Sequence, residues 1–149
     1  KKLKEELQNK LLLWQPGLVK QVRSVKGIGS RATATLIVAT QGFKNTHSYQ
    51  QLISYAGLSP KLYTSGKSIR GKVRISKKGG KQLRHILYMC ALNAKTTNPA
   101  CKALFDRLVA KRKNKKLAII AVCNKLLKQV FAVVKSGELY SDNYYKKTA

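Results

Sequence analysis

Apolar side chains recur along most of this chain at intervals of three and four residues, the spacing that aligns them on one face of a helix. The first such stretch covers 2–14, where one side is lined by Leu3, Leu7, Leu11 and Trp14. We expect the Pro-Gly pair at 16–17 to end this helix. Further helices are expected at 18–24, 31–40, 48–56 and 79–96, from 98–99 onward, and at 117–135.

The helix expected at 117–135 is apolar on most sides, which predicts that it lies deepest in the core. Gly57 and Gly137 follow expected helices as C-caps, and Ser76 is a candidate N-cap ahead of the helix at 79–96. The proline and glycines between 58 and 76 argue against a helix there, so a short extended piece or loose hairpin is expected. The predicted fold class is therefore all-α: a compact helical domain with a helix-hairpin-helix-like element and a long basic loop or short hairpin between helices.

A chain of 149 residues, 44% of them apolar, can bury one core. We assign that core to a domain at 18–140 and expect a loose tail at 141–149. The helix within 1–17 is interpreted as the end of an upstream linker or coiled coil, although an ordinary core-facing helix has the same pattern. The chain begins at Lys1 without a methionine, so we expect it to be part of a longer protein.

The formal net charge of +26 sets the class of partner. Only five acidic residues are present, and none lies between 7 and 105. A charge this large opposes compaction unless an anion screens it, so we predict nucleic-acid binding. The cations are spread over loops and several helices, which argues against a membrane surface. The three cysteines lack metal-ligand spacing and lie among apolar residues, as buried reduced thiols of a cytoplasmic protein do.

The sequence Val-Lys-Gly-Ile-Gly-Ser at 25–30 lies between two expected helices. This order resembles a helix-hairpin-helix, in which backbone amides of a glycine turn meet a nucleic-acid phosphate. Gly27 and Gly29 would let the backbone approach the phosphate, and Lys26 and Arg31 flank the turn. A plain αα-hairpin that uses glycine as a C-cap explains the same residues, so both interpretations stay open.

The stretch 57–84 holds nine Lys or Arg residues and no Asp or Glu. Its cations have no neutralising partner within the stretch, which is typical of a segment that receives a polyanion. Several of them lie near the start of the helix at 79–96, where they oppose the helix dipole and so indicate a bound anion. The predicted phosphate-binding cations are Lys67, Arg70, Lys72, Arg74, Lys77, Lys78, Lys81 and Arg84.

The residue inventory excludes several kinds of catalysis. Metal-dependent phosphoryl transfer needs clustered carboxylates, which the middle of the chain lacks, and no zinc ligand set is present. His47 and His85 have no obvious acidic partner for a catalytic triad. What remains is attack on a phosphodiester by a hydroxyl among cations, and Ser65, followed by a glycine that leaves room for DNA, suits that role. The alternative interpretation is that this Ser-Gly pair only forms a turn in a basic loop and has no catalytic role.

Several short motifs follow one another along 23–140: Gly27-Ile-Gly29, Gly57-Leu-x-Pro60, Ser65-Gly66, Arg70-Gly71, Ile75-Ser-Lys-x-Gly79, Leu83-Arg84 and Lys135-Ser-Gly137. In this order they resemble the C-terminal transposase domain of the DEDD insertion-sequence transposases. That group includes the Piv-type DNA invertases and the recombinases directed by a bridge RNA.

This resemblance implies that Ser65 becomes covalently joined to DNA, and that an upstream RuvC-like domain carries four acidic residues and Mg²⁺. It also implies a guide RNA as partner and a dimer or tetramer on DNA, in the bacterial cytoplasm near the nucleoid. The fragment alone is then expected to bind nucleic acid without recombining it, with no cofactor of its own. Rival nucleophiles are Tyr63, Ser68 and Ser76. The rival function is a non-catalytic helix-hairpin-helix or ribosomal-type binding module.

Overall fold

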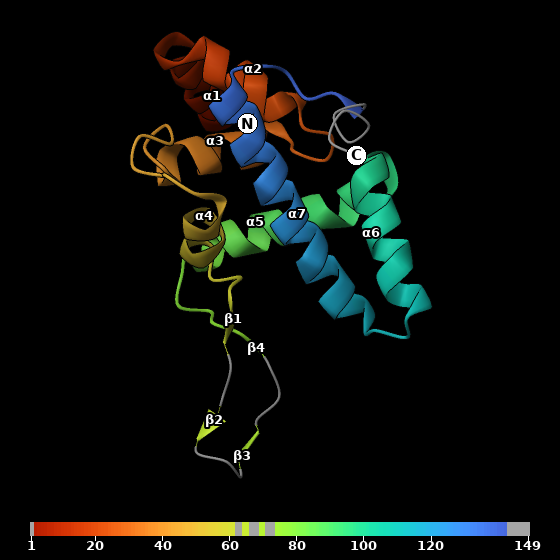
Figure 1. Cartoon of the computed structure of the whole chain (residues 1–149). Helices are drawn as coiled ribbons and strands as arrows, with labels where there is room; N and C mark the ends of the chain where they lie inside the picture. The colour runs from red at the N-terminus through yellow and green to blue at the C-terminus, as the bar shows by residue number, and fades with distance from the viewer. Residues whose placement is uncertain (1, 62–63, 66–68, 71–73, 143–149) are drawn as a thin grey trace.

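The computed structural model describes residues 2–61, 64–65, 69–70 and 74–142 (Figure 1). Its helices are α1 (Lys2–Trp14), α2 (Pro16–Ser24), α3 (Ser30–Ala39), α4 (Tyr49–Tyr55), α5 (Lys81–Thr97), α6 (Pro99–Ala110) and α7 (Lys115–Ser136). Its strands are β1 (Pro60–Lys61), β2 (Thr64–Ser65), β3 (Ile69–Arg70) and β4 (Arg74–Ile75). The predicted all-α domain with a short hairpin between helices is confirmed.

Helix α7 is the centre of the core, as its apolar sequence predicts. It packs against α2, α4, α5 and α6, and its fully covered side chains include Val122, Leu126 and Val130. This helix is long and apolar enough to cross a bilayer, but half of its most apolar window is buried inside the fold. Its contacts with four other helices identify it as the core helix of the domain.

Side chains at the helix ends explain most of the boundaries. Asn98 accepts a hydrogen bond from the Cys101 amide at 3.2 Å ahead of α6, and Ser48 accepts one from Gln51 at 3.3 Å ahead of α4. Gly137 ends α7 with a φ of 74°, as predicted.

Two details of the expected helix starts were wrong. The second helix begins at Pro16 and not at 18, because a proline in the first turn of a helix has no N–H that needs a partner. Ser76 does not cap α5: the N-cap is Gly80, and no side chain caps this helix.

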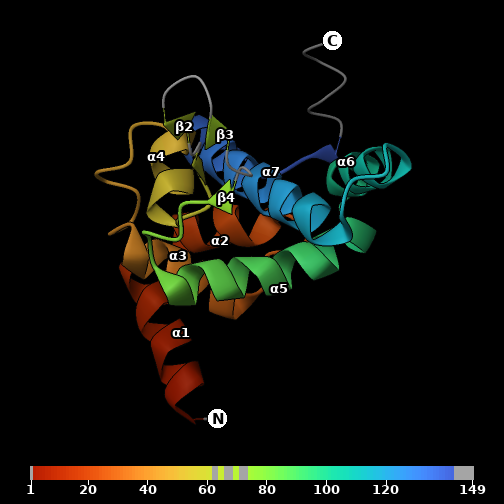
Figure 2. The same cartoon turned by 90° about the horizontal axis from the view of Figure 1, so that it is seen from below.

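The segment between α4 and α5 is a hairpin of short antiparallel ladders. In β1 and β4, Pro60 is paired with Ile75, and in β2 and β3, Ser65 is paired with Ile69. Figure 1 shows the hairpin extending away from the helices beside α4, with β2 and β3 at its far end. At the other end of the molecule, α1 projects from the body (Figure 2). On the face of α1 that was predicted to pack, Leu11 is buried but Trp14 is 54% exposed.

Candidate nucleic-acid interface

The base of the hairpin is held by two glycines that touch. A side chain on Gly79 would place its Cβ 1.9 Å from the carbonyl oxygen of Tyr55, and Gly57 has a φ of +69°. Beside them, the Arg84 guanidinium donates to the carbonyl oxygen of Ala56 at 3.2 Å. Arg84 was predicted to bind phosphate, and the structure gives its half-buried side chain a contact within the fold, at the end of α4.

Backbone hydrogen bonds close the same base. The Ser76 amide donates to the Ser59 carbonyl at 2.8 Å, and the Lys77 amide donates to the Gly57 carbonyl at 3.1 Å. Lys77 adopts a φ of 56°, the left-handed region that costs a residue with a side chain about 1–2 kcal/mol. The hairpin is therefore fixed to the helical body at its base by both packing and hydrogen bonds.

The cations around this base face solvent. Arg74, Lys77, Lys78 and Lys81 are exposed, and no acidic residue stands in the first turn of α5. Ser65 and Arg70 lie in the backbone ladder of β2 and β3. The structure thus gathers Ser65, Arg70, Arg74, Lys77, Lys78 and Lys81 in and around one projecting hairpin. Two of the predicted cations, Lys67 and Lys72, and the rival nucleophiles Tyr63 and Ser68 lie outside the described residues.

The glycine turn at 25–30 lies elsewhere, against the middle and end of α5. Gly27 has a φ of +102°, and a Cβ there would come 2.5 Å from the Cβ of Ala94. Gly29 is the N-cap of α3, has a φ of −86°, and has open space where a Cβ would be. Burial raises the pKa of the Cys90 thiol, and a hydrogen bond with the Gly29 backbone offsets part of that rise. Close packing against α5 is therefore a sufficient reason for glycine at 27.

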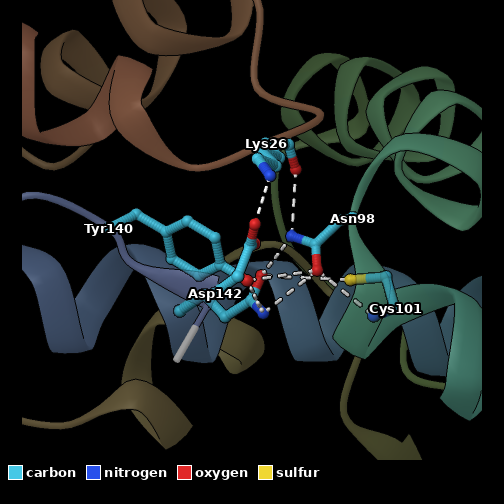
Figure 3. Close-up of polar contacts among 6 residues, drawn as sticks. Lys26, Asn98, Cys101, Tyr140 and Asp142 are labelled. Carbon is cyan, nitrogen blue, oxygen red and sulfur yellow. Dashed lines mark hydrogen bonds and ion pairs between the residues drawn. The ribbon is translucent and has the colours of Figure 1, made fainter. Parts of the chain in front are cut away.

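The two cations of this turn differ in their surroundings. Lys26 forms an ion pair with Asp142, whereas Arg31 is exposed on α3. The Lys26 carbonyl also accepts a hydrogen bond from the Asn98 amide nitrogen at 3.1 Å. Lys26 is thus attached both to the start of α6 and to the segment that follows α7 (Figure 3).

Asn98 is the centre of a buried polar cluster at this end of the molecule (Figure 3). Its amide nitrogen donates to Gln129 Oε1 at 3.0 Å, and its Oδ1 accepts from the Tyr140 hydroxyl at 3.3 Å. Burial raises the pKa of Tyr140 above its ordinary value, so the phenol stays protonated and able to donate. The cluster joins α6, α7 and the chain after α7 beneath the glycine turn.

Burial also determines the state of the cysteines. It raises the pKa of Cys101 to about 11 and that of Cys123 to about 12. All three thiols are free and buried, as predicted. Protonated, covered thiols are poor nucleophiles. Among the residues that the structure describes, no group of three His, Cys, Asp or Glu could hold a metal ion.

Helix α5 separates the two predicted binding regions. Ala94, which touches the glycine turn, lies thirteen residues beyond Lys81 at the hairpin base, or about 20 Å along a helix. This separation could not be predicted from the sequence, because it depends on which part of α5 contacts the turn. The polar cluster was also missed, since only the Asn-Pro helix start was visible at 98–99.

Between α6 and α7 the structure contains a groove of about 760 Å³ that sequence reasoning missed. Its lining includes Arg107, Lys125 and Lys128, together with Asp142. The sequence signal was a basic residue on one helix combined with two on the next, but only the packing of α6 on α7 brings them together.

Comparison with known proteins adds an independent finding. A family model described as "Transposase IS116/IS110/IS902 family" matches residues 19–106. An "Insertion element IS110 uncharacterized 43.6 kDa protein" of Streptomyces coelicolor is 29% identical over 135 residues, which is 91% of this chain and 33% of the relative. The "Pilin gene-inverting protein" of Moraxella bovis is 33% identical over 83% of this chain and 38% of the relative. The chain thus spans less than two fifths of each.

Proposed function

This chain belongs to the transposase IS116/IS110/IS902 family, and from that premise we propose that it is the DNA-binding, nucleophile-bearing part of a DNA recombinase. In this proposal Ser65 attacks a DNA phosphodiester and becomes covalently joined to the strand. The pilin gene-inverting relative supports recombination as the kind of reaction. A longer protein, of which this chain supplies about a third, would carry out the complete reaction.

The observation that favours Ser65 is the position of its strand. β2 lies at the far end of a hairpin that extends from the helices, so its backbone is not packed beneath them (Figure 1). The hairpin carries Arg70 on the paired strand and Arg74 nearer the base, and no carboxylate occurs anywhere from 57 to 84. A strand with this charge and projection suits close approach to a sugar–phosphate backbone.

The proposed step is a transesterification. The serine Oγ loses its proton to a base, a bond forms between Oγ and phosphorus, and the phosphorus–oxygen bond to one deoxyribose breaks. The freed deoxyribose oxygen takes up a proton, and the phosphodiester is conserved as a serine–DNA ester. Nearby guanidinium groups would stabilise the negative charge that builds up on the phosphoryl oxygens, a contribution that is often several kcal/mol in enzymes.

Mg²⁺ belongs to the proposal only through an upstream RuvC-like domain with four acidic residues. The described residues of this chain offer no carboxylate cluster, so they do not fit such a site and we assign them no step through a metal. When bound in that domain, Mg²⁺ would stabilise the leaving and attacking oxygens. In this proposal, this chain contributes the nucleophile, the cations and the contacts with DNA.

The test uses the longer recombinase that carries this chain. Incubated with a nicked DNA substrate, it should give a protein–DNA adduct that resists denaturation, and Ser65→Ala should abolish the adduct while binding stays within about twofold. Tyr63→Phe, Ser68→Ala and Ser76→Ala are the matched controls and should leave the adduct intact. An adduct that survives in Ser65→Ala refutes the assignment. Recombination that is unchanged in Ser65→Ala favours the non-catalytic binding module instead.

The partners of the whole protein are also proposals. We propose that a guide RNA supplies sequence choice, that the recombinase works as a dimer or tetramer on DNA, and that it acts in the cytoplasm, where bacterial DNA lies. Ribonuclease treatment of the purified recombinase should then remove sequence-specific binding while the salt-dependent, non-specific binding of this chain remains. Specific binding that resists ribonuclease contradicts the guide.

A further inference from the structure

The groove between α6 and α7 combines an apolar floor with a cationic rim. Small and apolar side chains from both helices line it, including Ala103, Leu104 and Ala121. The rim holds Arg107 from α6 with Lys125 and Lys128 from α7. Among the described residues that line it, Asp142 is the only carboxylate, and it forms an ion pair with Lys26.

The rim cations are close enough to disfavour one another. Burial lowers the pKa of Lys125 below its ordinary value. The nearby Cys101 opposes this shift, and the charges of Lys128 and Arg107 add to it. The Lys128 ammonium lies 4.8 Å from the ring centroid of Tyr49 on α4, which is not part of the groove lining. An anion in the groove would relieve this repulsion.

Asn124 supplies a second, independent sign of a ligand. It lines the groove, and its Oδ1 atom is buried without a hydrogen-bond partner. A buried acceptor left unsatisfied is unfavourable, so a ligand with a hydrogen-bond donor as well as negative charge would gain from a rotation of the Asn124 amide toward the groove. A nucleic-acid strand brings both, in its phosphates and in the N–H or hydroxyl donors of its bases and sugars.

We propose that the α6–α7 groove is a second nucleic-acid site, in which Arg107, Lys125 and Lys128 bind phosphates of a strand. Asp142 pairs with Lys26 at the edge of the groove until a phosphate replaces the carboxylate. The proposal rests on the nucleic-acid binding assigned above, but not on Ser65. Helix α6, which forms one wall of the groove, and the hairpin lie toward opposite ends of α5 (Figures 1 and 2). A strand bound in the groove is therefore separate from the one at the hairpin or a distant part of it.

The first experiment measures salt-dependent binding of the 149-residue chain to DNA and RNA duplexes of about 20 base pairs, by fluorescence anisotropy. The groove variant is R107Q with K125Q, and the matched control is K102Q with K116Q, which removes two exposed cations from the same helices outside the groove lining. The groove variant should flatten the salt slope by about two, because each phosphate contact contributes about 0.9. Equal slopes for the two double variants overturn the proposal.

The second variant tests Asp142. D142N removes the competing carboxylate and should tighten binding about twofold to fivefold, the effect expected for an exposed ion pair, and the gain should disappear when Lys26 is changed to Gln. Weaker or unchanged binding in D142N contradicts the assigned competition. Comparison of DNA with RNA then identifies the kind of strand. If the groove variant weakens binding to only one of the two duplexes, that nucleic acid is the one bound in the groove.

Lysine acetylation read by mass spectrometry keeps the proposal testable if a variant misfolds. Duplex should slow acetylation of Lys125 in the unchanged chain and leave the exposed Lys102 reactive. Protection of Lys125 by concentrated protein alone would show a second copy of the chain in the groove and overturn the proposal. A further result would refute the groove site but not the proposed function of the hairpin. In that result, R74Q with K77Q loses binding, while the groove variant binds like its control.

Discussion

Replacement of Gly27 by alanine separates packing from phosphate binding as the reason for the glycine turn. The new Cβ would lie 2.5 Å from the Cβ of Ala94, and the backbone φ of +102° is strained for any residue with a side chain. The backbone term costs about 1–2 kcal/mol, and overpacking typically costs about 1–3 kcal/mol. We therefore expect Gly27→Ala to lower the free energy of unfolding by about 2–5 kcal/mol, measured by urea denaturation.

The steric part of that loss can be recovered separately. Ala94→Gly removes the clashing methyl and should itself cost about 1 kcal/mol, the usual penalty for glycine inside a helix. Combined with Gly27→Ala it should destabilise by about 1–3 kcal/mol less than the sum of the two single changes, because the overpacking disappears while the backbone strain remains. Additive losses would show that Ala94 is not the obstacle.

Gly29→Ser is the matched control in the same turn. Gly29 has open space around it and an N-cap backbone, so serine should leave stability unchanged or raise it by about 0.5 kcal/mol. If the turn also binds phosphate, this substitution should weaken DNA binding by obstructing the approach. The packing argument is refuted if Gly27→Ala keeps full stability and loses only affinity for DNA.

Three further outcomes follow from burial and backbone geometry. Tyr140→Phe should cost about 1 kcal/mol near neutral pH by removing hydrogen bonds to Asn98 and Gln129. Because the folded-state pKa of Tyr140 is raised, its contribution is complete below about pH 10 and is lost as pH rises through the folded value, so the two chains should converge in alkaline denaturation. Thiol reagents at pH 8 should leave Cys123 unmodified until the chain unfolds, since its pKa is about 12 and it is fully covered; rapid labelling of native protein would contradict this. Lys77→Gly should stabilise the chain by about 1 kcal/mol by relieving the left-handed backbone, yet reduce the salt slope of DNA binding by about one; a loss of stability would show that the Lys77 side chain supports the hairpin base.

Local pattern determined the helices well because each helix needs only its own apolar face and ends. Leu11 and the core residues of α7 are buried at the predicted spacing, and Gly137 ends α7 as expected. The errors lie where a distant contact decides. Ser76 precedes α5 in the manner of a cap, but the contact of Gly79 with the end of α4 sets that boundary.

The candidate site depends even more on contacts between distant residues, which the local sequence does not predict. A basic, acid-free stretch at 57–84 is visible in the composition, and it becomes the projecting hairpin. The pairing of Lys26 with Asp142 joins residues separated by 116 positions, and no spacing rule reports such a contact. The glycine turn was correctly found as a turn, but its contact with Ala94 depends on the register of α5 against it.

The position of α5 has a consequence for how the two cationic regions could act together. Its 17 residues span about 25 Å between the base of the hairpin and the start of α6. A helix fixes this separation far more firmly than a loop does, whereas a two-stranded hairpin of short ladders is only marginally stable alone. The hairpin must therefore take its position from the contact between Gly57 and Gly79 and, in the proposed complex, from the DNA. A strand held in the α6–α7 groove would limit where that DNA can lie, so an anchor remote from Ser65 would help to set the phosphodiester that Ser65 reaches.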